Sequence, residues 1–169
     1  MLPGEVAGAI ALRPTRGDDE AFLRELFRAS REEMLARVAW TEAQKAGFCR
    51  SQYEARDLHY RNFFPGARHS IVELARERVG AMIVARTAAT LYLVDVCIAP
   101  AFQGRGIGTQ LLLGLQEEAR SLGVPLTLHV DSESRARRLY ARHGFAALGD
   151  DGVTCEMEWA AGTRLPTSR

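Results

Sequence analysis

The chain has 169 residues, 47% of them hydrophobic, which suits one compact domain with a buried core. Lysine and arginine total 22 against 21 aspartate and glutamate, so charge gives no support to a nucleic-acid or anionic-membrane partner. The 3 cysteines form no CxxC pair and no apolar run approaches the ~20 residues that span a bilayer, so we expect no disulfide framework, no metal site and a cytoplasmic location.

The first third of the chain predicts a strand and two helices. Residues 9–13 are typical of a short strand, and Asp18 or Asp19 after it is suited to capping a helix. The apolar residues of that helix recur at intervals of three and four: Phe22, Leu23, Leu26 and Phe27. A second helix is predicted over 42–64, with a break possible at Gly47.

Short β-type runs follow, and their short connections predict an antiparallel meander. The pattern then alternates between helical and extended segments. The expected strands are 70–75, 79–86, 91–98, 126–130, 145–148 and 154–159, and the expected helices are 107–122 and 134–143.

These elements predict a single α/β domain over residues 5–160, with helices flanking a mixed, mostly antiparallel sheet of about six to seven strands. The helix over 134–143 has Ser132 or Ser134 as its cap. The tail over 161–169 has little to bury, so we expect it to be mobile.

A glycine-rich turn joins the strand over 91–98 to the helix over 107–122. It reads Gln103-Gly104-Arg105-Gly106-Ile107-Gly108, and its glycines let the backbone approach a ligand closely. Free N–H groups at the start of a helix, with the positive end of its dipole, suit a pyrophosphate. The turn therefore predicts a local anion site, and a turn that only shapes the junction is the simpler alternative.

A dinucleotide-binding fold is a second alternative for the turn. Asp131 ends the next strand near the place of a ribose-binding acid. However, Thr109 stands at the third small position of G-x-G-x-x-G, and residues 99–103 separate the strand from the glycines. The antiparallel meander also conflicts with a parallel α/β sheet.

The turn resembles the Gln/Arg-x-x-Gly-x-Gly/Ala loop of the GNAT superfamily of N-acetyltransferases. The segment Arg138-Leu139-Tyr140-Ala141-Arg142-His143-Gly144-Phe145 is similar to its second signature, a helix with Leu-Tyr followed by Gly-Phe. The predicted strand order also fits over 9–159. The resemblance implies transfer of an acetyl group from acetyl-CoA to a primary amine, by direct attack in a ternary complex.

The resemblance also implies where acetyl-CoA binds. It would lie where the fourth and fifth strands separate, with the main chain of Val96, Cys97 and Ile98 pairing with its pantetheine arm. The other residues implied are Gln103, Gly104, Arg105, Gly106, Ile107, Gly108, Thr109 and Ser134. One departure is that the Asn often found just before the fourth helix is missing, with Glu133 and Ser134 in its neighbourhood.

By the same resemblance, Tyr140 would face the thioester sulfur. The leaving thiolate resembles a Cys side chain of pKa about 8.5, and a phenol of pKa about 10 can donate a proton to it. A fixed N–H such as that of Ile98 would stabilise the carbonyl oxygen in the transition state. A packing role on the sheet is the alternative for Tyr140.

Asp95 is the candidate for the catalytic base, because it is the only acid on the strand over 91–98. It would act directly or through water, or bind the acceptor cation, and a structural hydrogen-bond role is the alternative. Glu73 is the reserve. A lysine-like amine of pKa about 10.4 needs a base, whereas an α-amine of pKa about 7.8 hardly does.

The remaining candidates point to structure or to substrate selection. Cys97, flanked by two aliphatic residues, is more typical of a core residue than of a nucleophile. Structural roles are expected for His59, His69, His129 and His143. In such folds the acceptor cleft is walled by the segment that carries Trp40, Tyr53, Arg56, His59 and Tyr60, with Arg56 away from the face that carries Tyr53 and Tyr60.

No motif identifies the acceptor. Small amine, amino acid, antibiotic, peptide N-terminus and lysine all stay open, and a homodimer is possible. A non-catalytic acyl-CoA-binding or regulatory module is the alternative function, and a dinucleotide-dependent oxidoreductase is the third.

Overall fold

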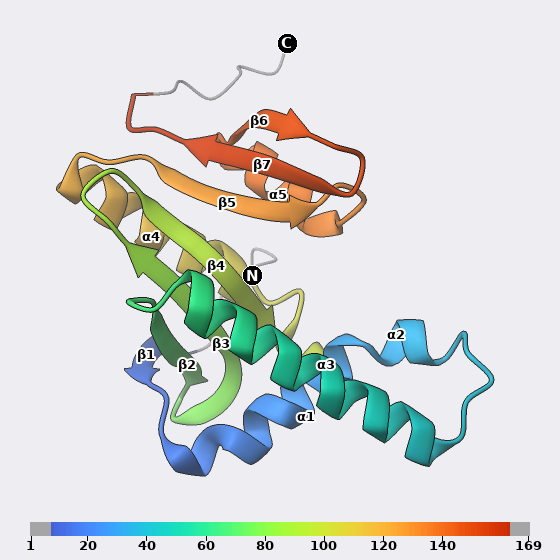
Figure 1. Cartoon of the computed structure of the whole chain (residues 1–169). Coiled ribbons are helices and arrows are strands. Elements are labelled where there is room, and N and C mark those ends of the chain that lie inside the picture. The colour runs from blue at the N-terminus through green and yellow to red at the C-terminus, as the bar shows by residue number, and fades with distance from the viewer. Residues whose placement is uncertain (1–7, 163–169) are drawn as a thin grey trace. The chain divides into compact units, whose positions relative to one another are not determined.

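The computed structural model describes residues 8–162. Seven strands form one sheet in the order β1-β2-β3-β4-β5-β7-β6 (Figure 1). The described residues divide into two compact units, one of residues up to 83 together with 95–107, the other of 84–94 together with residues from 108 onward. The predicted mixed sheet with helices is confirmed.

The first unit contains the N-terminal elements. β2 and β3 are joined by Ala75 and Arg76, whose φ values of 51° and 69° are those of a tight hairpin turn. Neither residue type signals such a turn in sequence. The elements that begin in this unit are β1 (Ile10–Pro14), α1 (Glu20–Ser30), α2 (Glu32–Leu35), α3 (Glu42–Phe63), β2 (Arg68–Leu74) and β3 (Glu77–Arg86).

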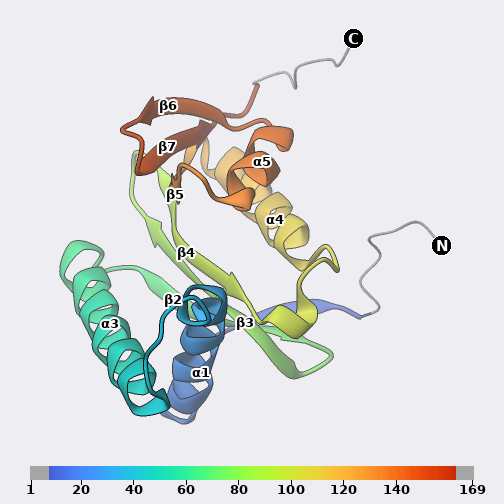
Figure 2. The same cartoon turned by 90° about the vertical axis from the view of Figure 1, so that its right-hand side faces the viewer.

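α3 begins at a capping box. The Gln44 N–H donates to Thr41 Oγ1 at 3.2 Å, and the Thr41 N–H donates to Gln44 Oε1 at 2.8 Å. The helix then runs for 22 residues without a break at Gly47. Packing against α1 supports this length, since Phe27 and Tyr53 meet edge to face at 5.8 Å between ring centroids. The two helices lie side by side in both views (Figures 1 and 2).

The turn before α1 differs from the expectation. A 3-10 turn, η1 (Gly17–Asp19), precedes the helix, and neither predicted aspartate caps it with its side chain. Instead Asp19 is fully buried and accepts two hydrogen bonds from Arg13, at 2.7 and 2.8 Å. The guanidinium offers a stronger, charge-assisted partner than the helix N–H groups do.

The second unit contains the C-terminal elements. β5 pairs in parallel with β4 and antiparallel with β7, which also pairs with β6. Its core is formed by residues such as Leu91, Leu126 and Cys155, all with no exposed surface. The bounds are β4 (Leu91–Ile98, from 95 on in the first unit), α4 (Ile107–Leu122), β5 (Leu126–Asp131), α5 (Arg135–Arg142), β6 (Ala146–Asp150) and β7 (Thr154–Trp159).

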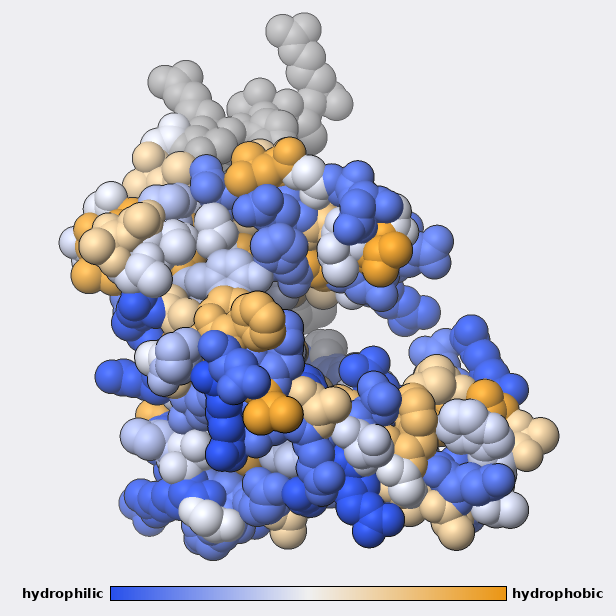
Figure 3. All heavy atoms as spheres, in the orientation of Figure 1, coloured by the Kyte–Doolittle hydropathy of each residue, from blue (hydrophilic) through white to orange (hydrophobic). Residues whose placement is uncertain are grey.

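The surface agrees with the balanced composition. On the face shown in Figure 3, hydrophilic residues are interspersed with isolated hydrophobic ones. Within residues 8–162, no helix is both long and apolar enough to cross a membrane. The tail predicted to be mobile lies, from residue 163 on, outside the described residues.

Candidate active site

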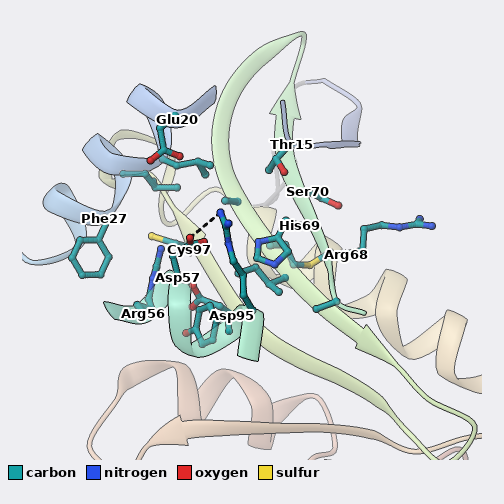
Figure 4. A pocket seen from close by; sticks show the side chains of 18 of the residues that line it. Thr15, Glu20, Phe27, Arg56, Asp57, Arg68, His69, Ser70, Asp95 and Cys97 are labelled. Carbon is teal, nitrogen blue, oxygen red and sulfur yellow. Dashed lines mark hydrogen bonds and ion pairs between the residues drawn. The ribbon is translucent and has the colours of Figure 1, made fainter. Parts of the chain in front are cut away.

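A pocket of about 730 Å³ lies in the first unit (Figure 4). It is lined by the turn after β1, by α1 and α3, and by β2, β3 and β4. Apolar and ionisable side chains share this wall, which suits a ligand with both an apolar body and a polar reacting group. The residues used below are Phe27, Tyr53, Arg56, Tyr60, His69, Asp95 and Cys97.

One face of α3 forms much of the pocket wall. Residues three and four apart lie on the same side of a helix, so Tyr53, Arg56 and Tyr60 all reach the pocket. The placement of Arg56 away from that face was therefore wrong. Trp40 and His59 do not line the pocket, and they stack instead on Phe48 and Phe63, at 5.3 and 4.4 Å between ring centroids.

Arg56 connects α3 to β4. Its NH1 group donates to Asp95 Oδ2 at 3.0 Å, and the two side chains are 28% and 29% exposed. Its guanidinium carbon also lies 4.7 Å from the ring centroid of Phe27, 5.5 Å from that of Tyr53 and 5.7 Å from that of Tyr60. Cation–π attraction and the ion pair together hold the guanidinium beside Asp95.

Burial changes the acid–base properties of β4. It raises the pKa of the Asp95 carboxyl above its usual value, although Arg56 and the Val96 N–H act in the opposite direction. Burial and the neighbouring Asp95 raise the pKa of Cys97 to about 11. Cys97 is therefore a neutral thiol at pH 7, as its sequence context predicts for a residue that is not a nucleophile.

Two further acid–base candidates lie on β2. His69 lines the pocket, and burial lowers the pKa of its imidazole, which keeps it neutral at pH 7. The isolated histidines of the sequence gave no sign that this one reaches the site. Glu73 does not line the pocket, and its carboxylate accepts from Arg13 Nε at 2.6 Å. Glu73, the second candidate from the sequence for the base, is therefore already in an ion pair with Arg13.

The glycine-rich turn follows β4 and a short 3-10 turn, η2 (Pro100–Phe102). Gly104 and Gly106 have φ values of 73° and 79°, which glycine adopts without strain. The Gln103 amide donates to the Ile98 carbonyl at 2.8 Å and closes the turn onto the end of β4. Arg105 is exposed and stacks over the Phe102 ring at 5.0 Å.

The backbone also comes close at the end of β4. A Cβ atom on Gly80 of β3 would lie 2.4 Å from the Cys97 carbonyl oxygen, so only glycine fits there. The approach fixes the main chain of residues 96–98, which is the segment that the resemblance assigns to the pantetheine arm.

Tyr140 lies on α5 in the second unit. It is 7% exposed, and its ring centroid is 5.6 Å from that of Phe145. Ser134 caps α5, because its Oγ accepts from the Ala136 N–H at 3.2 Å. A Cβ atom on Gly108 would lie 3.9 Å from Leu139 Cδ2, so the first turn of α4, which contains Gly108 and Thr109, is close to the α5 motif.

Comparisons with known proteins bear on this arrangement. Residues 65–147 match the family model of the acetyltransferase (GNAT) domain. That match includes β4, the glycine-rich turn and α5. A comparison with curated protein sequences found no significant match.

Solved structures share the fold. The chain is similar to the PaiA N-acetyltransferase from Thermoplasma acidophilum in complex with coenzyme A, with a TM-score of 0.69 and 20% identity over 90% of this chain and 99% of that one. It is also similar to a GCN5-related N-acetyltransferase from Rhodopseudomonas palustris (TM-score 0.64, 22% identity, 94% and 100% covered). A third similar structure is a GNAT family acetyltransferase from Elizabethkingia anophelis with acetyl-CoA bound. Its TM-score is 0.59 and its identity 15%, over 90% of this chain and 98% of that one.

Proposed function

We propose that the chain is a GNAT acetyltransferase, an acyltransferase, and that it acetylates a primary amine that binds in the pocket beside Asp95. The observation that carries the proposal is Asp95 itself. It lies on β4 within the pocket, and its pKa is raised toward the range of a useful base.

Acetyl-CoA is the donor in this proposal. Its pantetheine arm pairs with the main chain of residues 96–98, and its pyrophosphate binds the N–H groups of the turn over 103–108 and of Thr109. The positive φ values of Gly104 and Gly106 support this role. The Ser134 hydroxyl already caps α5, so we expect Ser134 to contribute at most through its main chain.

The acceptor nitrogen attacks the thioester carbonyl carbon, forming the C–N bond while the C–S bond breaks. Asp95 takes the proton that the nitrogen loses, directly or through water, and the Ile98 N–H stabilises the carbonyl oxygen as it gains charge. Tyr140 donates its proton to the departing thiolate, which leaves as the thiol of CoA. His69 is a second candidate for the base, because it is neutral and lines the same pocket.

An acceptor screen with thiol detection of released CoA tests the activity. Release that depends on an amine supports the transferase. Binding of acetyl-CoA without release for any amine would favour a non-catalytic acyl-CoA-binding module.

The variant Asp95→Asn tests the base. Since the pKa of Asp95 is raised, the wild-type rate should fall as the pH drops through that raised value, and the variant should lose this dependence. We expect a kcat lower by roughly 10²-fold for an acceptor of high pKa, with the greatest loss above that raised pKa, where the wild-type carboxylate is ionised. Asp57→Asn is the matched control, because Asp57 lines the same pocket but pairs with Arg61 at 2.9 Å. If the pH profile of Asp95→Asn is unchanged, Asp95 has a structural role and His69 becomes the candidate for the base.

A further inference from the structure

The charges around the pocket favour an acceptor that carries a negative group. Four arginines and three acids line it: Arg16, Arg56, Arg61, Arg68, Glu20, Asp57 and Asp95. Each of the three acids already has an arginine partner, at 2.8 to 3.0 Å. Within residues 8–162, no ion pair engages Arg16 or Arg68. The lining therefore has surplus positive charge, which disfavours a purely cationic acceptor.

Arg56 has an unused donor beside the base. Its NH1 group is taken by Asp95, but its Nε–H is buried and has no acceptor among the described residues. A buried donor without a partner is destabilising, and a hydrogen bond to a ligand oxygen would remove that cost. The side chain as a whole is 28% exposed, whereas the Nε atom has almost no exposed surface, so a ligand oxygen reaches Nε–H only when the side chains around it shift.

The geometry of a guanidinium indicates which chemical group of the ligand supplies this oxygen. Nε–H and one terminal NH₂ group form a side-on fork that matches the two oxygens of a carboxylate. The rings of Phe27, Tyr53 and Tyr60 lie 4.7 to 5.7 Å from the guanidinium carbon and hold the group in place. A fork held in this way loses little entropy when it binds a carboxylate.

The separation of the two partners restricts the acceptor further. Arg56 and Asp95 are in direct contact at 3.0 Å, so the amine at Asp95 and the carboxylate at Arg56 must be close together in the acceptor. An α-amino acid has a single carbon between these groups. We propose that the acceptor is a free α-amino acid, whose carboxylate binds the Nε edge of Arg56 while its amine faces Asp95. This inference rests on the proposed transferase activity.

Other amines fit these observations less well. A peptide N-terminus presents a neutral amide carbonyl in place of the carboxylate, so it offers Arg56 one oxygen without a negative charge in place of a bidentate ion pair. A polyamine has no anionic group, and it would add charge to a lining that is already positive.

The test compares each free α-amino acid with its α-amide and with its decarboxylated amine, in an assay of acetyl-CoA-dependent CoA release. We expect kcat/KM for the best amino acid to exceed that of its amide and its decarboxylated amine by about 10- to 100-fold. Equal values across such a set would overturn the carboxylate assignment and leave the transferase standing. No release from any compound would overturn both proposals.

Variants locate the carboxylate. Arg56→Lys keeps a cation beside Asp95 but removes the fork, so KM for the amino acid should rise tenfold or more, and by more than the KM of the decarboxylated amine. Arg24→Lys is the matched control, because Arg24 also stacks on Tyr53, at 4.8 Å, but lies outside the pocket lining and pairs with Glu20 and Glu54.

The thermal midpoint of each variant checks that it is folded. If Arg56→Lys fails to fold, Arg56→Gln is measured in the same way. A folded variant of either kind with a wild-type KM for the amino acid would overturn the assignment.

Discussion

Removal of the Tyr140 hydroxyl distinguishes a role of this residue as proton donor from a role in packing. Its ring packs on Phe145 and is almost fully buried, so Tyr140→Phe keeps the ring packing and removes the phenol hydroxyl. If that proton goes to the CoA thiolate, kcat should fall by roughly 10²-fold, with little change in acetyl-CoA affinity or thermal midpoint. The measurement is kcat with one identified acceptor, under conditions where chemistry limits the rate.

Tyr92→Phe is the control for Tyr140, since Tyr92 lies in the same unit and its hydroxyl is in a hydrogen bond, 2.6 Å from His129 Nδ1. It should cost about 1 kcal/mol of unfolding free energy and leave kcat unchanged. A Tyr140→Phe enzyme within twofold of wild type would remove Tyr140 from the mechanism and leave it a packing residue.

Asp19 is a residue whose contribution to stability depends on pH. The hydrogen bonds from Arg13, with others from the Arg16 N–H and from Arg78, hold the pKa of its carboxyl well below the usual range. Because the folded-state pKa is depressed, the stabilisation is complete above the unfolded pKa of about 3.9 and is lost as the pH falls below it. Acid should therefore destabilise the turn that forms one edge of the pocket.

Asp19→Asn should lower the unfolding free energy by roughly 2 kcal/mol at neutral pH, because two partly exposed arginines lose their shared anion. The difference from wild type should shrink as the pH falls from 5 to 3. Denaturant unfolding at several pH values measures it. Asp18→Asn, an exposed neighbour, should stay within about 0.5 kcal/mol; an equal loss in both variants would contradict the role of the Arg13 pair.

The turn between β4 and α4 is the element that we expect to bind the pyrophosphate. Gly106 has a φ of 79°, so Gly106→Ala strains the backbone and displaces the N–H groups around it. Acetyl-CoA affinity should drop by about tenfold or more, which calorimetry measures.

Gly152→Ala separates strain from binding. Gly152 has a similar φ of 84° and no atom near its missing Cβ, but it belongs to the connection between β6 and β7 and not to the glycine-rich turn. It should lose similar stability while keeping acetyl-CoA affinity. Unchanged affinity in a folded Gly106→Ala protein would contradict the assignment of the turn.

For the whole molecule, ligand-dependent stability distinguishes the two cofactor classes that the glycines suggest. At 100 times its Kd, acetyl-CoA should stabilise the protein by about 2.7 kcal/mol, because it binds only the folded state. For a chain of this size that corresponds to roughly 5–10 °C in Tm. NADH at the same concentration should have no effect. A shift with NADH and none with acetyl-CoA would favour the dinucleotide alternative.

The elements of the molecule were largely predictable from the sequence, because their signals are local. β4 and α4 have the predicted bounds, and the predicted cap Ser134 begins α5. Hydrophobic periodicity and caps act between residues within about four positions of one another, so they can be read from one segment. The short helix α2 was missed, since its residues carry no comparable signal. The connection expected over 76–78 is a tighter turn at Ala75 and Arg76, whose residue types do not indicate positive φ values.

The sequence by itself indicated the resemblance to the GNAT acetyltransferases, from the glycine-rich turn and the Leu-Tyr and Gly-Phe motif, and the family model of that domain matches residues 65–147. It also identified Asp95 as the one acid of its strand. Only the tertiary structure decided what surrounds that acid. Arg56 is 39 residues from Asp95 and Asp19 is six residues from Arg13, and both ion pairs depend on how helices and strands pack. Burial, which raises the pKa of Asp95, arises from that packing as well, so no property of the segment over 91–98 alone could predict it.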